Sequence, residues 1–222
     1  MKTELIDFVY STVVLTLLTC LAVIMAGATA GSLEQVLGMY TPLLAVLAFL
    51  LFFGLLCALC TRLIMTFRPL TAGKHSMDSQ LFTRWKLFIV IYEFGRAALL
   101  PFTVVFLRPV VAALFGAKVG KDIALGGHLV DPELITIGDE AIIGQGSVVS
   151  AHTITSGFLI LGPVVIGNRA TVGVNAVVMS GVHLGDDSIL TPGTTVPPGT
   201  IIPPGELWGG NPARKIRSLT DG

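Results

Sequence analysis

Residues 166–202 read IGNRAT-VGVNAV-VMSGVH-LGDDSI-LTPGTT-VPPGTI-I, and an aliphatic residue returns at every sixth position of this stretch. The returning residues are Ile166, Val172, Val178, Leu184, Leu190, Val196 and Ile202. Such a period predicts a parallel β-helix, in which six residues make a short strand and a turn, and three such units close one coil. We expect the aliphatic side chains to fill the interior of the coils, while glycines allow the tight corners.

A second run of the same kind lies upstream, in a different phase. Its returning residues are Val119, Leu125, Ile137, Ile143 and Val149, with Asp131 in the slot between Leu125 and Ile137. The two runs predict about four coils in total. Residues 154–165 break the phase between them, so we expect a loop or an altered turn there.

The first half of the chain has a different character. The protein has 222 residues, of which 53% are apolar and only 13% charged, well below the charged fraction of about 25% in soluble domains. Between Phe8 and Thr61 the one charged residue is Glu34. Residues 6–25 and 37–60 are apolar runs long enough to cross about 30 Å of hydrocarbon, so both are predicted transmembrane helices. A cleaved signal peptide is the alternative for the first run.

The distribution of charge predicts how this hairpin is oriented. Residues 27–35, between the two runs, contain no Lys or Arg, whereas Arg62, Arg68, Lys74 and Arg84 follow the second run. By the positive-inside rule, both ends of the hairpin and the β-helix are then cytoplasmic. The chain has no net charge, but its two halves do. Up to Lys118 it has nine basic and five acidic residues, and after Lys118 it has five basic and nine acidic residues.

Residues 86–118 are apolar but interrupted by charges and by Pro101 and Pro109. We interpret them as kinked helices in the cytoplasmic interface, with Trp85 and Tyr92 as anchors at the level of the lipid headgroups; a third transmembrane span is the alternative. The predicted domains are therefore a transmembrane hairpin (1–70), a linker with interfacial helices (71–118) and a β-helix (119–222).

The β-helix half resembles a known family over residues 119–218. The hexads, the break after His152, the stretch IGNRATVG from Ile166 and the ending WGGNPARKI from Trp208 are similar to the left-handed β-helix acyltransferases. Membrane helices that lead into such a domain also resemble the carboxy-terminal region of ε-poly-lysine synthetases. The resemblance implies a mainly β fold, a left-handed parallel β-helix, and acyl transfer from a thioester to a hydroxyl or an amine.

His152 occupies the position at which this family keeps its general base, just before the loop that breaks the phase. An imidazole there would take the proton from the attacking acceptor. The alternative is a structural histidine bonded to a neighbouring carbonyl. His128, Asp131 and Glu133 are candidate contacts to the acceptor. Counting hexads places His128 on a different face of the prism from His152.

The resemblance also implies where the thioester lies. Its pantetheine arm would run past Gly173, Val174, Pro192 and Gly193, and Arg214 or Arg217 would meet the nucleotide phosphates of an acyl-CoA. Turn geometry alone is an equal explanation for the glycines. Where the family carries a Thr-Lys step, this chain has Pro197-Pro198 after Val196, which favours a carrier-protein phosphopantetheine thioester as the alternative donor.

The expected assembly is a homotrimer in contact with membrane lipids, with a carrier protein or an adenylation-domain protein as a further possible partner. No metal is predicted, because the sequence has no closely spaced histidine pair, and no nucleic acid, because it has no basic stripe. Three functions remain open from the sequence: acyl transfer from coenzyme A, aminoacyl transfer from a carrier protein, and a non-catalytic membrane scaffold.

Overall fold

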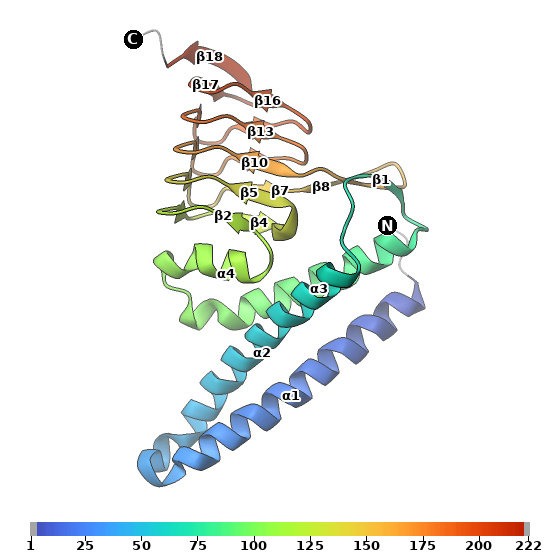
Figure 1. The fold of residues 1–222 in the computed structure, drawn as a ribbon, viewed down its shortest axis with the longest axis vertical. Helices are drawn as coiled ribbons and strands as arrows, with labels where there is room; N and C mark the ends of the chain where they lie inside the picture. Colours follow the sequence, from blue (N-terminus) through green and yellow to red (C-terminus); the bar gives the residue numbers. More distant parts are fainter. Residues whose placement is uncertain (1–3, 220–222) are drawn as a thin grey trace. The chain divides into compact units, whose positions relative to one another are not determined.

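The computed structural model describes residues 4–219 and separates into two compact units. One unit contains the chain up to Pro69 together with Thr83–Val104, and the other contains Leu70–Phe82 together with the chain from Val105 onward. The first unit is helical and the second holds the β-helix (Figure 1).

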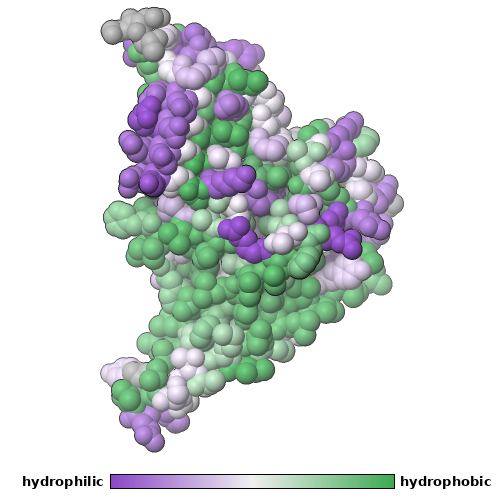
Figure 2. All heavy atoms as spheres, in the orientation of Figure 1, coloured by the Kyte–Doolittle hydropathy of each residue, from purple (hydrophilic) through white to green (hydrophobic). Residues whose placement is uncertain are grey.

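Two long helices form most of the first unit. They are α1 (Leu5–Leu37) and α2 (Thr41–Phe67), joined by a 3-10 turn, η1 (Gly38–Tyr40). Both are long and apolar enough to cross a membrane, and Figure 2 shows the hydrophobic residues that cover them. Residues 27–35, which separate the two apolar runs, are themselves helical, and α1 ends only at Gly38, whose positive φ of 51° suits a residue without a Cβ.

A third helix, α3 (Gln80–Leu99), packs in the same unit and is followed by the 3-10 turn η2 (Leu100–Phe102). A Cβ on Gly54 of α2 would lie 2.4 Å from Cγ of Leu99, so this glycine is what lets the two helices approach. Lys86 of α3 pairs with Asp7 of α1, and both side chains are about nine-tenths buried. The prediction that Trp85 and Tyr92 anchor the chain at headgroup level is wrong, because both are buried by protein.

The second unit is a parallel β-helix whose coils stack into three sheets (Figure 1). The first sheet contains β2 (Lys118–Val119), β5 (Ile135–Ile137), β10 (Val164–Ile166), β13 (His183–Leu184) and β16 (Ile201–Ile202). The second contains β3 (Ala124–Leu125), β6 (Ile142–Ile143), β11 (Thr171–Val172), β14 (Ile189–Leu190), β17 (Glu206–Gly209) and β18 (Arg214–Ser218), the last being antiparallel. The third contains β4 (His128–Val130), β7 (Val148–Ser150), β12 (Val177–Val178) and β15 (Thr195–Val196).

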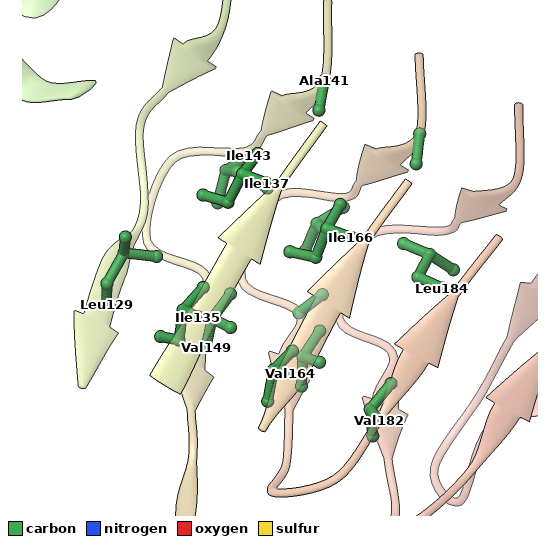
Figure 3. Packing of buried hydrophobic residues seen from close by; sticks show 14 of the residues in the cluster. Leu129, Ile135, Ile137, Ala141, Ile143, Val149, Val164, Ile166, Val182 and Leu184 are labelled. Atoms are coloured by element: carbon green, nitrogen blue, oxygen red, sulfur yellow. The ribbon is translucent and has the colours of Figure 1, made fainter. Parts of the chain in front are cut away.

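The predicted left-handed β-helix is confirmed, with about five coils in place of the four expected. The aliphatic residues of the hexads point inward and form one buried cluster, as Figure 3 shows for Ile143, Ile166 and Leu184. At most corners the chain turns through a residue with positive φ, such as Asn175, Asp187 or Gly193. A small buried residue then restarts the strand, so that these corners close in the same way and the next coil can pair with them.

The first coil does not follow the count made from the sequence. Leu129, and not Asp131, is the inward residue of β4, because it pairs with Val149 of the next coil. Asp131 instead makes the corner, with a positive φ of 60°, and a 3-10 turn, η4 (Pro132–Leu134), follows it. His128 begins β4 in the third sheet, whereas His152 follows β7 and begins β8, which belongs to a separate sheet.

The break in the repeat is a hairpin that leaves the prism. It consists of β8 (His152–Thr155) and β9 (Phe158–Leu161), which pair in antiparallel fashion around Ser156 and Gly157. A short strand from the linker, β1 (Gly73–Ser76), adds to the outer edge of β9. We call these three strands the arm. The hydroxyl of Thr153 bonds that of Ser180 at 2.7 Å, which ties the base of the arm to the next coil.

Both ends of the prism are covered. At the start, η3 (Val105–Leu107) and α4 (Arg108–Leu114) contact β2 and β3, with Ala112 and Phe115 buried. At the other end, β18 folds back on β17 and Trp208 packs against the buried cluster. Covering the two ends keeps the apolar interior of the coils away from water.

Adjacent residues of β16 test this account of the interior. Ile202 is 1% exposed and Ile201 is 70% exposed. We expect Ile202→Ala to lower the free energy of unfolding by about 2–5 kcal/mol, because it leaves a cavity between coils. Ile201→Ala is the matched control and should cost about 0.5 kcal/mol or less. Denaturant unfolding of the purified protein measures both, and equal losses would contradict the inward assignment.

Candidate active site

His152 lies at the corner that follows the third sheet, where the arm leaves the prism. Its ring atom Nδ1 is 2.6 Å from Oδ2 of Asp131, whose side chain is completely buried. The imidazole side chain is 21% exposed, so it reaches both the buried carboxylate and the surface. A carboxylate on Nδ1 fixes the ring orientation and holds a proton on that nitrogen, which makes Nε2 the atom available to basic chemistry.

Local chain geometry places these two residues together. Asp131 follows β4 and His152 follows β7, and these neighbouring parallel strands end at the same corner. The left-handed backbone at Asp131, which aspartate tolerates better than most residues, directs its carboxylate there. The Ser150 hydroxyl donates to the carbonyl of His152 at 3.1 Å and holds the backbone of the corner.

Glu133 stands in the same corner, on η4, and has an unusual environment. Both of its carboxyl oxygens are buried, and neither has a hydrogen-bond partner among the described residues. Burial, and then the charge of Asp131, raise the pKa of Glu133 from its usual 4.5 to about 9. A Cβ on Gly116 would lie 3.0 Å from Cβ of Glu133, so the backbone closes tightly over this side chain. Glu133 is therefore a neutral carboxylic acid at pH 7.

The residues predicted to meet a pantetheine arm lie together at another corner. Gly173 and Val174 follow β11, and Pro192 and Gly193 follow β14 one coil later. The N–H of Gly193 donates to the carbonyl of Val174 at 2.8 Å, which links the two coils. A Cβ on Gly173 would lie 2.6 Å from the backbone nitrogen of Pro192. Stacking of the coils alone therefore accounts for glycine at position 173.

The remaining predicted residues are spread over the same prism. Arg214 begins β18 and lies opposite Gly209, the last residue of β17. This is the edge of the second sheet at which the Gly173 corner also begins. Arg217 lies further along β18, opposite Leu207. Both arginines are exposed. His128 is the first residue of β4, whereas Asp131 comes directly after the last one. The two residues therefore lie at opposite edges of the third sheet.

Within one chain, the two groups of residues therefore occupy different edges of the prism. His152, Asp131 and Glu133 lie where the third sheet gives way to the first. Gly173, Val174, Pro192 and Gly193 lie where the second gives way to the third. Among residues 4–219, no group of three or more His, Cys, Asp or Glu side chains has the arrangement of a metal site.

The partner of His152 is the feature that the sequence did not assign. Asp131 was expected to contact the acceptor, and the structure bonds it to the imidazole. A signal was present: Asp131 replaces an aliphatic residue in the hexad slot and precedes Pro132, a combination typical of a turn. The Pro197-Pro198 step forms a corner like the others, in which the Thr200 hydroxyl donates to the carbonyl of Pro197 at 2.7 Å.

Comparison with known proteins confirms the resemblance on which the site assignments rest. Residues 163–198 match the family model described as bacterial transferase hexapeptide (six repeats). The protein named "Putative acetyltransferase YvoF" of Bacillus subtilis is 33% identical over 103 residues, which cover 45% of this chain and 59% of that protein. The chain thus spans less than two thirds of the length of this relative.

A second relative is the delta-poly-L-ornithine synthetase of Acinetobacter baumannii, which is 30% identical over 101 residues, or 45% of this chain and 8% of that enzyme. Among solved structures, a hexapeptide-repeat-containing acetyltransferase of Vibrio cholerae superimposes with a TM-score of 0.52 at 20% identity, covering 66% of this chain and 96% of that one. This likeness shows the fold.

The buried carboxyl of Glu133 predicts a pH dependence of stability. Between about pH 4.5 and pH 9 the unfolded chain loses the Glu133 proton and the folded chain keeps it, so folding must take up a proton and stability falls as pH rises. One such group contributes a slope of up to about 1.4 kcal/mol per pH unit. Glu133→Gln removes it, so the variant should gain stability relative to the parent from pH 5 to pH 8. Identical pH profiles of the two proteins in urea unfolding would contradict a neutral Glu133.

Proposed function

We propose that this β-helix, which carries the hexapeptide repeat of bacterial transferases, makes the protein a membrane-anchored acyltransferase. It moves an acyl group, most simply acetyl, from an acyl-CoA thioester to a hydroxyl or amine acceptor. The observation that carries the proposal is the 2.6 Å contact between His152 Nδ1 and the buried carboxylate of Asp131. The name of the Bacillus subtilis relative, an acetyltransferase, supports the choice of reaction.

In this proposal His152 is the general base and Asp131 is a positioning residue. Nε2 of His152 takes the proton of the acceptor while the acceptor oxygen or nitrogen attacks the thioester carbonyl. The carbonyl carbon forms a bond to the acceptor, and the carbon–sulfur bond breaks to release the pantetheine thiol. Asp131 stabilises the imidazolium formed during the attack, in the way that a buried aspartate supports the histidine of a catalytic triad.

The donor site is proposed to form between subunits of a homotrimer. Its thioester arm lies along Gly173, Val174, Pro192 and Gly193 of one chain, and Arg214 and Arg217 attract the nucleotide phosphates. Because these residues and His152 occupy different edges of the prism in a single chain, a neighbouring chain is needed to bring a base to the thioester. His128 is proposed to contact the acceptor, whereas Glu133, predicted from the sequence for the same role, is not, because both of its carboxyl oxygens are buried.

The anchor is proposed to be the helical hairpin of residues 1–70. Only 17% and 28% of the residues in the most apolar windows of α1 and α2 are buried, too few for core helices of a soluble domain. The cations that follow α2 support a cytoplasmic location for both ends of the hairpin, and with them for residues 119–222.

A second function has a specific observation in its favour. The similarity to the poly-ornithine synthetase matches aminoacyl transfer from a carrier-protein phosphopantetheine thioester to an amine, with amide-bond formation. Such a donor has the same thioester arm and lacks the adenine nucleotide, so it does not need the Lys that Pro197-Pro198 replaces. An adenylation-domain protein would load the carrier. A non-catalytic trimeric scaffold is the remaining alternative and predicts no thioester binding.

Two variants test the base and its positioning residue. We expect His152→Ala and Asp131→Asn each to lower kcat by about 10²–10⁴-fold, since the first removes the base and the second favours the wrong tautomer. Thiol release by the detergent-purified protein measures the rate. Asp131→Asn should leave the KM for the donor unchanged. A collapse of the site would instead raise this KM. Full activity of His152→Ala would eliminate this residue as the base.

The donor is identified by a direct comparison of two thioesters. Acetyl-CoA and an acylated carrier protein are offered separately, and release of the thiol from each is followed. The proposal predicts discharge of acetyl-CoA, with a higher donor KM in Arg214→Ala because a phosphate contact is lost. Discharge of the carrier alone would favour aminoacyl transfer. Thermal stabilisation by neither thioester would support the scaffold.

A further inference from the structure

The start of the β-helix carries an apolar surface for which the reaction has no use. It consists of residues of η3 and α4 that are between 37% and 84% exposed: Val105, Phe106, Leu107, Val110 and Leu114. We call these five residues the cap face. Phe106 is the most exposed of them, at 84%. Figure 2 shows hydrophobic residues over this segment.

The cap face belongs to a helix whose other side is already occupied. Ala112 and Phe115 are 8% and 1% exposed and face the first coil, and Arg108 donates to the carbonyl of Gly126 at 3.3 Å. Val110 and Leu114, four residues apart, lie on one face of α4. The segment is therefore apolar on two sides, of which one packs on the prism and the other is presented outward.

We propose that the cap face inserts into the lipid–water interface of a membrane and seats the β-helix on the bilayer surface. Val105–Leu114 is ten residues long, or about 15 Å as a helix, which is half of what a span requires. A short apolar segment of this kind lies in the interface and does not cross.

The surrounding charge selects lipid as the occupant. From Ala97 to Lys121 the chain contains no Asp or Glu, and its charged residues are Arg108, Lys118 and Lys121. Lys118 and Lys121 are exposed just after the cap. Cations beside an apolar face complement anionic lipid headgroups. The proposal rests on the membrane anchor proposed above, which keeps the cap near a bilayer.

The test uses the full chain, reconstituted in nanodiscs of phosphatidylcholine and phosphatidylglycerol. Cys20, Cys57 and Cys60 are replaced by Ala, and a nitroxide is attached at Phe106→Cys. Collisions with oxygen, which concentrates in lipid, are compared with collisions with a water-soluble nickel chelate. Leu17→Cys in α1, 64% exposed, reports on the anchor, and Ile201→Cys in β16, 70% exposed, is the matched control on the prism.

The proposal predicts that position 106 resembles position 17, with an oxygen-to-nickel collision ratio several-fold above that at position 201. A low ratio at 106, as in water, would overturn it. Loss of access to both reagents at 106 would also overturn it, because the cap face would then be covered by a second copy or by another protein. A low ratio at position 17 would refute the membrane anchor itself. Failure of the anchor is thus distinguished from failure of the cap-face proposal, in which only position 106 has a low ratio.

Discussion

The stacking of nearly identical coils is the constraint on which the rest of the β-helix depends. Each strand can pair with the next coil because most corners use the same left-handed turn and an aliphatic residue returns to the interior in each hexad. The close approach of Gly173 to Pro192 is one example, since a Cβ there would collide with the next coil. The regular stack leaves chemistry to the corners, where side chains are free to vary. His152, Asp131 and Glu133 occupy the corner at which the repeat is most irregular.

That irregular corner combines two departures from the repeat. Asp131 closes the first coil with a left-handed residue and a 3-10 turn, and His152 opens the arm in the second. Because the two coils are in register, the departures meet and form a carboxylate–imidazole pair. Glu133 beside it has its pKa raised to about 9, first by burial and then by the charge of Asp131. The corner that presents Gly173 and Val174 lies on another edge of the prism, which is the physical reason for proposing a site shared between chains.

Periodicity predicted the interior of the β-helix well, because an aliphatic residue every sixth position reflects the same packing requirement in every coil. It failed in the first coil, where Asp131 occupies a hexad slot in the sequence while Leu129 fills the interior. A turn with a different number of residues shifts the phase without changing composition, so counting could not detect it. The sequence also could not show that Trp85 and Tyr92 are buried, since burial depends on how α3 packs. His152 was found through the resemblance, whereas its orienting partner needed the register of β4 and β7.

The central claim is that one chain supplies the base and its neighbour supplies the thioester site. Coexpression of two inactive variants tests it directly. His152→Ala lacks the base, and Val174→Trp, at a residue 47% exposed, blocks the donor corner without entering the core. If the sites lie between subunits, the coexpressed population regains about a quarter of the parental activity, because at equal expression that share of all interfaces combines two intact halves. Mixed trimers as inactive as either variant alone would contradict the claim.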